Sequence, residues 1–422
     1  MLPGDLIELD VEKPAAGGRM IARHGGQVVL VLGAIPGERV RARVERVEKR
    51  LAFASAAEIL TPSADRRERT ADPLCGGCVY AHVEYARQVA LKSEVIADAF
   101  IRIGRIPLES RVPVAVSQES GYRLRARLHV AGGRAGFFRE GTHQLCDAGA
   151  TGQLLPASLT AIEAVLSALG AGATEVASIE ISENVAADER ALHLDLAGPA
   201  LADGILASAV AAGRLTGCSA RAANGVFATA GDPAVADPLA ALTAGRATGG
   251  QLRRHAVSFF QGNRFLIADL VSAVMDAVPP DGDVLDLYAG VGLFAVSLAA
   301  AGRGAIAAVE GDRESGADLL RNAVPYSTQL QATVGRVEDH LRRRTAATVI
   351  VDPPRAGMSK DAMDAIVQLA AARLVYVSCD PPTMARDARR LLDAGYRIAS
   401  IRGFDLFPNT PHVETVGVFD RG

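Results

Sequence analysis

The C-terminal part of the chain, from about residue 258 onward, alternates short apolar runs with helical patterns, and this alternation restricts the fold more than any other feature. The runs that have the length and composition of buried strands cover residues 284–288, 305–310, 348–352, 374–378, 397–402 and 414–419. Strands that alternate with helices predict an open parallel sheet. Only residues 403–412 separate the last two runs, too few for a crossover helix, so we expect the last strand to be antiparallel.

A chain of 422 residues is too long for one ordinary core, and its pattern changes twice. We expect an α/β fold with a small β-barrel over residues 1–60, a β-rich central domain over 61–250 and the parallel-sheet domain over 251–422. With 22% charged residues, five cysteines and a net charge of −3, the composition excludes a disulfide-framed secreted module and a disordered chain. The first residues show no secretory signal pattern, and we expect a cytoplasmic protein with reduced thiols and no membrane anchor.

The N-terminal region reads as short strands separated by glycines, which fits a small closed barrel of the oligonucleotide-binding kind. In one strand the period of two separates arginines from apolar residues: Arg39, Arg41 and Arg43 on one face, Val40, Ala42 and Val44 on the other. A strand face with three arginines is a candidate phosphate contact. A solvated face with no ligand is the alternative interpretation.

The central region begins with a predicted helix over residues 84–103, which we expect to pack on the C-terminal domain. The following segment alternates, so that Arg123, Arg125 and Arg127 share one side, and Phe137 and Phe138 come after a glycine turn. Arginines beside exposed aromatic rings suit single-stranded or looped RNA. Residues 151–250 are rich in alanine, and their pattern predicts no particular arrangement of helices and strands.

A glycine turn follows the first strand of the C-terminal domain. Gly290 and Gly292 allow the backbone to approach a ligand closely, and Glu310 ends the next strand, where a carboxylate can accept both hydroxyls of a ribose. A dinucleotide site needs a third glycine where this chain has Ala295, so S-adenosylmethionine, which has no phosphate, fits better. Gln261 at the domain entrance is a further candidate contact. A purely structural turn and a packing segment at the domain junction are the alternatives.

Three short motifs near the C-terminus supply reactive groups in a fixed order. They are Asp352-Pro353-Pro354-Arg355, Ser378-Cys379-Asp380-Pro381 and His412-Val413-Glu414. A thiol and a carboxylate suit methylation at carbon 5 of uracil, because that carbon becomes nucleophilic only after a thiolate adds to carbon 6. We assign the attack to Cys379 and removal of the carbon 5 proton to Glu414. A cysteine that is merely buried at a strand end is the alternative.

With these motifs the chain resembles the RNA uracil-5-methyltransferases that modify ribosomal or transfer RNA, over nearly its whole length. The resemblance implies a class I Rossmann-like methyltransferase domain, an N-terminal TRAM barrel and S-adenosylmethionine as the methyl donor. It implies that Cys379 is the nucleophile, Glu414 the base and Asp352 a contact to both uracil and cofactor. It further implies that Gln261, Tyr288 and Glu310 contact the cofactor.

The chain departs from the family pattern at several positions. Asp380 replaces the asparagine that usually follows the cysteine, and its charge would raise the pKa of the thiol unless it is turned away. Asn409, Leu293 and Arg336 also replace more usual residues. None of these positions supplies an essential reacting atom.

Cysteines in the linker match three of the four ligands that many relatives use for a 4Fe–4S cluster: Cys75, Cys78 and Cys146. Residues 66–74 contain no fourth cysteine, so a water molecule, His82 or Asp72 would have to complete the site. A vestigial loop and a zinc site are the alternatives. Cys218 reads as a small buried residue.

RNA is the partner that these features predict, and we expect a monomer. The TRAM-like barrel and the cysteine loop favour 23S ribosomal RNA as the substrate, with transfer RNA as the alternative. An RNA-binding or assembly factor that keeps the fold without catalysis is the alternative from a different functional class. A small-molecule methyltransferase would not need about 250 residues ahead of its catalytic domain.

Overall fold

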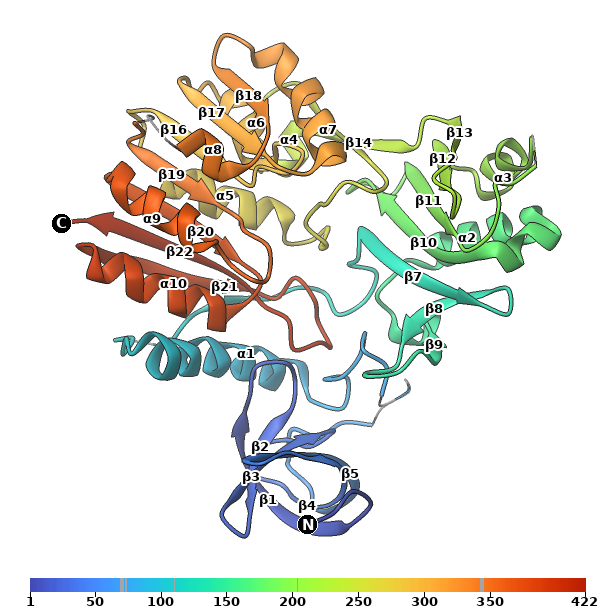
Figure 1. Cartoon of the computed structure of the whole chain (residues 1–422), viewed down its shortest axis with the longest axis vertical. Coiled ribbons are helices and arrows are strands. Elements are labelled where there is room, and N and C mark those ends of the chain that lie inside the picture. Colours follow the sequence, from blue (N-terminus) through green and yellow to red (C-terminus); the bar gives the residue numbers. More distant parts are fainter. Residues whose placement is uncertain (69–71, 73, 110, 203, 342–344) are drawn as a thin grey trace.

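A computed structural model describes residues 1–68, 72, 74–109, 111–202, 204–341 and 345–422. The barrel with the N-terminus lies at the bottom of Figure 1, the domain with the C-terminus at the upper left and the central sheet at the right. The predicted α/β fold with an N-terminal barrel and a β-rich central region is confirmed.

The N-terminal strands close into a barrel in the order β1-β2-β3-β5-β4. Their bounds are β1 (Leu6–Pro14), β2 (Met20–His24), β3 (Gln27–Leu32), β4 (Arg39–Val47) and β5 (Leu51–Thr61). The predicted alternation in β4 is confirmed, because Val40 and Ala42 are buried in the barrel core while Arg39 and Arg43 are exposed. Arg39 and Arg41 both form ion pairs with Glu8 on β1, which offsets part of their positive charge.

The central sheet has the strand order β13-β12-β11-β10-β7-β8-β9. Its strands are β7 (Arg125–Ala131), β8 (Arg134–Phe138), β9 (Leu145–Asp147), β10 (Val176–Glu183), β11 (Arg190–Leu196), β12 (Gly217–Arg221) and β13 (Phe227–Gly231). Helices α2 (Pro156–Leu169) and α3 (Ile205–Gly213) share an apolar core with one face of the sheet. The stretch Pro156–Glu175 is long and apolar enough to cross a membrane by length and composition, but α2 buries Ile162, Val165 and Leu169 in this core.

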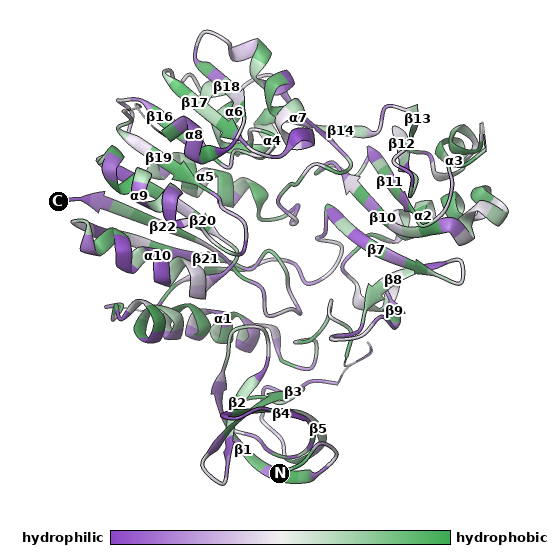
Figure 2. Cartoon of the chain, viewed as in Figure 1, coloured by the Kyte–Doolittle hydropathy of each residue, from purple (hydrophilic) through white to green (hydrophobic). Residues whose placement is uncertain are grey.

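The sheet of the C-terminal domain has the order β18-β17-β16-β19-β20-β22-β21-β6. Many of its residues are hydrophobic and are coloured green in Figure 2. Its strands are β16 (Val284–Leu287), β17 (Ile306–Glu310), β18 (Leu330–Val334), β19 (Thr348–Val351), β20 (Arg373–Ser378), β21 (Tyr396–Phe404), β22 (Glu414–Arg421) and β6 (Val114–Ala115). Strand β22 is antiparallel to both of its neighbours, as predicted. Strand β18 and the short β6 were not predicted from the sequence.

Helices cover both faces of this sheet. One apolar cluster contains residues of α4 (Leu239–Leu242), α5 (Ile267–Ala277), α6 (Leu293–Ala300) and α7 (Arg313–Ala323). The other contains residues of α8 (Val337–Leu341), α9 (Lys360–Leu369) and α10 (Pro381–Asp393). A separate pair, β14 (Ala234–Pro238) and β15 (Gln251–His255), lies between the central sheet and this domain. Short helical turns cover Gly149–Thr151, Gly170–Glu175 and Val324–Tyr326.

Helix α1 (Tyr85–Ala99), which continues as a π-helical turn over Phe100–Gly104, connects the barrel to the C-terminal domain. Leu91 packs in the barrel cluster, whereas Ile96 and Phe100 pack in the cluster that contains α9 and α10. The helix therefore packs on both the barrel and the C-terminal domain. Lys13 of β1 also pairs with Asp98 at 2.6 Å, which fixes the barrel to the helix.

Candidate active site

The ends of three neighbouring strands bring the predicted reactive groups together. Asp352 directly follows β19 and Cys379 directly follows β20, and parallel strands present such residues at one edge of a sheet. Strand β22 runs in the opposite direction and pairs Thr415 with Ser378. The next position in this register places Glu414 opposite Cys379. The structure thus gathers Asp352, Cys379 and Glu414 at a single edge.

The Glu414 carboxyl is almost completely enclosed, with 4% of the residue exposed. Its Oε1 atom has no hydrogen-bond partner among the described residues. Burial and the nearby Asp352 raise its pKa well above the ordinary value, although Arg355 acts in the opposite direction. A carboxyl with a raised pKa and an unused oxygen is suited to taking up a proton.

The Cys379 thiol is half-buried. Burial and the neighbouring carboxyls of Glu414 and Asp352 raise its pKa to about 11, while Arg355 favours the thiolate through its charge and a hydrogen bond. Arg355 belongs to one of the three sequence motifs, but we predicted no role for it from the sequence. Its position could have indicated a role, because an arginine three residues after Asp352 can reach the sheet edge at which Asp352 lies. Arg355 is the cation that opposes the two carboxyls.

Asp380, the departure next to the nucleophile, is turned away from the thiol. It is the N-cap of α10, and its side chain accepts a hydrogen bond from the Thr383 amide at 3.3 Å. The same helix directs the positive end of its dipole toward the segment that carries Cys379. The carboxylate of Asp380 therefore stabilises the helix start.

We expect Asp380→Ala to lower the free energy of unfolding by about 1 kcal/mol, because the cap is lost. Asp380→Asn retains an N-cap acceptor and should change stability by only a few tenths of a kcal/mol. Urea unfolding of both variants measures this difference. The pH dependence of Cys379 alkylation in Asp380→Asn should match that of the unmodified chain; a large shift would mean that Asp380 does act on the thiol.

Asp352 is held by Gln261, whose Nε2 atom donates a hydrogen bond to Oδ2 at 3.0 Å. Burial raises the pKa of Asp352 to about 7, and this hydrogen bond partly counteracts the effect. Gln261 lies in the loop after β15. The structure therefore brings the predicted cofactor contact Gln261 onto the predicted substrate contact Asp352.

The glycine turn after β16 has the backbone geometry that a bound ligand requires. Tyr288, Gly290 and Gly292 have φ angles of 60°, 57° and 93°. A Cβ atom on Gly292 would lie 2.7 Å from Val296, so glycine is needed there for packing. A Cβ atom on Gly290 would meet nothing within 4 Å, which leaves open space beside the turn.

Two carboxyl groups bind backbone amides of this turn and of the helix that follows it. Glu310 accepts a hydrogen bond from the Gly290 amide at 2.6 Å, and Asp286 accepts one from the Ala295 amide at 3.0 Å. The other oxygen of Asp286 has no partner among the described residues, and burial raises the pKa of this carboxyl to about 8. Acceptors beside an open turn fit the hydroxyl and amino groups of S-adenosylmethionine, which Tyr288, Gly290, Gly292 and Glu310 would hold.

Comparison with known proteins gives the same assignment. The family described as tRNA (Uracil-5-)-methyltransferase matches residues 329–421, and the TRAM domain matches residues 2–57. An uncharacterized RNA methyltransferase of Streptomyces coelicolor is 33% identical over 99% of this chain and 93% of its own length. The 23S rRNA (uracil(1939)-C(5))-methyltransferase RlmD of Methylococcus capsulatus is 31% identical over 100% of this chain and 98% of its own length. The chain belongs to the RNA uracil-5-methyltransferase family.

The fold of this uracil-5-methyltransferase also matches a solved structure. Pyrococcus abyssi tRNA (uracil-54, C5)-methyltransferase in complex with S-adenosyl-L-homocysteine superposes with a TM-score of 0.74 and 24% identity, covering 98% of this chain and 100% of that chain. The prediction of an S-adenosylmethionine-dependent RNA uracil-5-methyltransferase with a TRAM barrel is therefore confirmed.

The loop before Glu414 is fixed by α1 in this uracil-5-methyltransferase. Lys92 of α1 forms a fully buried ion pair with Asp405 and donates a hydrogen bond to the Phe407 carbonyl at 3.1 Å. Asn409, with a φ of 64°, accepts a hydrogen bond from Gln88 at 2.9 Å. A short side chain tolerates this left-handed backbone better than most alternatives, which gives the departure at position 409 a structural reason. Burial lowers the pKa of His412 to about 4, so its ring is neutral at physiological pH.

The cysteine loop does not have the chemistry of the predicted cluster site. Cys75 and Cys146 form a disulfide, so the expectation of reduced thiols is wrong for this pair, and disulfide sulfurs are not thiolate ligands. Cys78 is buried close by and donates to the Cys75 carbonyl at 3.6 Å. The part of the chain that the structure describes contains no group of three or more His, Cys, Asp or Glu residues that could hold a metal ion. With Cys75 and Cys146 bonded to each other, the described cysteines of this loop do not offer the three free thiolates that we predicted for an iron–sulfur or zinc site.

Proposed function

We propose that this enzyme transfers a methyl group from S-adenosylmethionine to carbon 5 of a specific uridine in 23S ribosomal RNA. The observation that carries the proposal is the register of β20 and β22, which sets the thiol of Cys379 opposite the buried carboxyl of Glu414, beside Asp352. A thiol, a base and a hydrogen-bonding carboxyl at one sheet edge are the groups that this reaction needs. S-adenosylmethionine supplies the methyl group.

In the proposed reaction the Cys379 thiolate adds to carbon 6 of the uracil, and the electrons of the carbon 5–carbon 6 double bond form an enolate. Carbon 5 is then nucleophilic enough to accept the methyl group. Glu414 removes the proton from carbon 5, the double bond forms again and the thiolate leaves carbon 6. Arg355 lowers the pKa of the thiol and thus favours the first step. Asp352, held by Gln261, is placed to contact the base.

The open face of the central sheet supports RNA as the partner. The strand register lines up Phe227, Arg221, Asp195, Ser178 and His129 across this face. Phe227 is 54% exposed and offers a stacking surface, while Arg221 and Arg127 lie nearby, paired with Asp195 at 2.6 and 3.1 Å. Exposed aromatic rings with arginines suit unpaired bases and their phosphates. A target in a loop would need no base flipping out of a duplex.

The predicted arginine row needs correction at two positions. Arg123 lies between the rings of Phe137 and Phe407, at 5.2 and 5.5 Å from their centroids, and Arg125 pairs with Glu180 in a mostly buried position. Phe137 is buried, and Phe138 stacks on His129 with a centroid distance of 3.6 Å. The expectation of exposed aromatics is therefore wrong for Phe137, and among the three arginines Arg127 is the one half-exposed to solvent.

A methyl-transfer assay tests the proposed function. Unmodified 23S ribosomal RNA and transfer RNA transcripts are incubated separately with S-adenosylmethionine labelled in its methyl group. We expect label in the 23S transcript, and mass mapping of RNA from a strain that lacks the protein should show one uridine without its methyl group. Label in transfer RNA alone would contradict the ribosomal target. RNA retention without any label would indicate the non-catalytic binding factor.

We also infer a monomer that acts in the cytoplasm, where these RNAs are found.

A further inference from the structure

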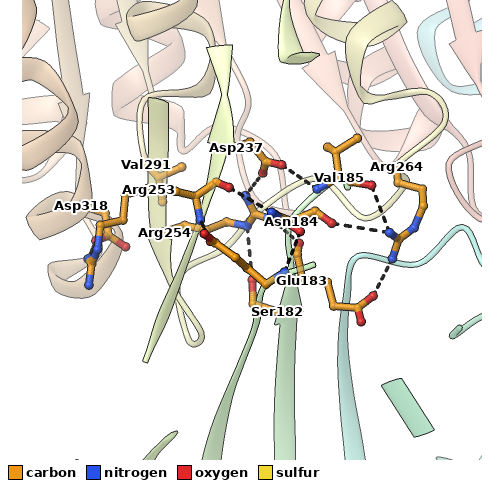
Figure 3. Close-up of polar contacts among 12 residues, drawn as sticks. Ser182, Glu183, Asn184, Val185, Asp237, Arg253, Arg254, Arg264, Val291 and Asp318 are labelled. Atoms are coloured by element: carbon orange, nitrogen blue, oxygen red, sulfur yellow. Dashed lines mark hydrogen bonds and ion pairs between the residues drawn. The ribbon is translucent and has the colours of Figure 1, made fainter. Parts of the chain in front are cut away.

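A short segment that starts at β15 connects the central sheet to the active site. Figure 3 shows Arg254 of this segment between Ser182, Glu183 and Asp237, with Arg253 on the opposite side beside Asp318. The first group of residues comes from β10 and β14, whereas Asp318 belongs to α7 of the catalytic domain. The segment is thus bound on both sides.

Arg254 is completely buried, and its guanidinium has several polar partners and one aromatic partner. It forms an ion pair with Asp237, donates to Ser182 Oγ at 3.2 Å and donates to the Glu183 carbonyl. Its guanidinium also lies 3.8 Å from the centroid of the Phe260 ring. A planar guanidinium can bind several acceptors and stack on a ring at the same time, which a lysine cannot do.

On the catalytic side the same segment is hydrogen-bonded to α7. The His255 amide and the Ser258 hydroxyl both donate to Asp318 Oδ2, at 2.6 and 2.7 Å. Asn322 donates to the Arg253 carbonyl at 2.7 Å and to the Val291 carbonyl at 2.9 Å. Val291 stands between the two glycines of the cofactor turn. The segment is therefore connected through Asn322 to the glycine turn of the candidate cofactor site.

Phe260, the ring that Arg254 covers, immediately precedes Gln261. Phe260 is buried, and Gln261 donates to Asp352 at 3.0 Å. We propose that Arg254 is a positioning residue, which holds Phe260 and thereby places Gln261 on Asp352 for cofactor binding and methyl transfer. This inference rests on the proposed roles of Gln261 and Asp352.

Stability alone does not account for a buried arginine at this position. A buried ion pair is on average no more stabilising than well-packed apolar residues of the same volume. An arginine fixes the direction of each contact, since its donors must meet Asp237, Ser182 and Glu183 together. Directional fixation is what a side chain requires if it holds Phe260, the residue next to the proposed cofactor contact Gln261.

The test compares Arg254→Met with Arg190→Met. Arg190 also pairs with Glu183 and is largely buried, but among the described residues the guanidinium recorded over the Phe260 ring is that of Arg254. Calorimetric titration of S-adenosylhomocysteine is carried out on both variants below their melting temperatures, which thermal unfolding establishes. We expect the Kd of Arg254→Met to rise roughly tenfold and its kcat/KM to fall about 10- to 100-fold, because small misplacements are costly at reacting centres. Arg190→Met should stay within about twofold of the unmodified chain.

A double-mutant cycle shows whether Arg254 acts through Gln261. If it does, adding Arg254→Met to Gln261→Ala should change ligand binding by less than about twofold, since the contact is already lost. Effects that multiply in the double variant, or equal losses in Arg254→Met and Arg190→Met, would overturn the proposal. Arg254→Lys keeps the charge beside Asp237 and should give a Kd between those of the unmodified chain and Arg254→Met. It replaces Arg254→Met in the test if that variant does not fold. Failure of the proposed function is distinguished separately, because the unmodified chain would then produce no 5-methyluridine.

Discussion

Replacing Cys379 by alanine is expected to abolish methyl transfer, with kcat falling roughly 10⁴- to 10⁶-fold, the scale on which enzymes lose rate when a covalent nucleophile is removed. Without the thiolate, carbon 5 of the uracil stays a poor nucleophile even when the methyl donor is bound. Transfer of labelled methyl groups to 23S ribosomal RNA under single-turnover conditions measures this loss.

An RNA with 5-fluorouridine at the target position tests the role of Cys379 in a second way, because it should trap the covalent complex between the enzyme and the RNA. Fluorine replaces the proton that Glu414 removes in the proposed reaction, so the adduct of the unmodified chain should persist on a denaturing gel. Cys379→Ala should give no such band. Cys218→Ala is the matched control, because Cys218 is fully buried in the core of the central domain, and it should trap RNA as the unmodified chain does. A persistent band in Cys379→Ala would assign the nucleophile to another residue.

The thiol should also respond to pH in a defined direction. Since its pKa is raised to about 11, the thiolate fraction below that value grows about tenfold for each pH unit. The rate of trapping with the fluorinated RNA should therefore increase with pH across the neutral range. Arg355 favours the thiolate, so Arg355→Met should slow trapping at every pH in this range.

The parallel sheet and the meeting of three reactive residues could be predicted from the sequence because both follow from local patterns. Apolar runs between helices specify a parallel sheet, and residues that follow parallel strands meet at one edge. The reversed direction of β22 followed from the short spacer before it, and this direction brings Glu414 to Cys379. The prediction succeeded where chain connectivity alone restricts the geometry.

Other features depend on contacts between distant segments and left no local pattern. Strand β6 has two residues and exists because it pairs with β21, while the Cys75–Cys146 disulfide joins residues 71 positions apart. The burial of Arg254, in contrast, could have been predicted from the sequence. Arg254 shares a strand face with Leu252, which is buried, and an arginine at an apolar position of a strand indicates a buried charge with partners. The identity of those partners requires the tertiary structure.

Replacing Glu414 by glutamine is expected to stop the reaction after the methyl group has been transferred. Glutamine keeps the shape but cannot accept the carbon 5 proton, and the loss of a general base typically costs 10²- to 10⁴-fold. Natural RNA should then remain attached to Cys379 on a denaturing gel, with little 5-methyluridine released. Asp420→Asn is the matched control. It weakens the ion pair with Arg373 at the far end of the same strand and should leave product release unchanged.

The pH dependence of stability provides an independent check on Glu414→Gln. Because the folded pKa of Glu414 is raised, the folded chain binds more protons than the unfolded chain above pH 4.5, so this group makes stability fall as pH increases up to the folded pKa. Glutamine removes that penalty. Glu414→Gln should therefore be at least as stable as the unmodified chain at pH 8 while being nearly inactive. A variant that is both less stable at pH 8 and fully able to release product would show that Glu414 supports the strand and is not the base.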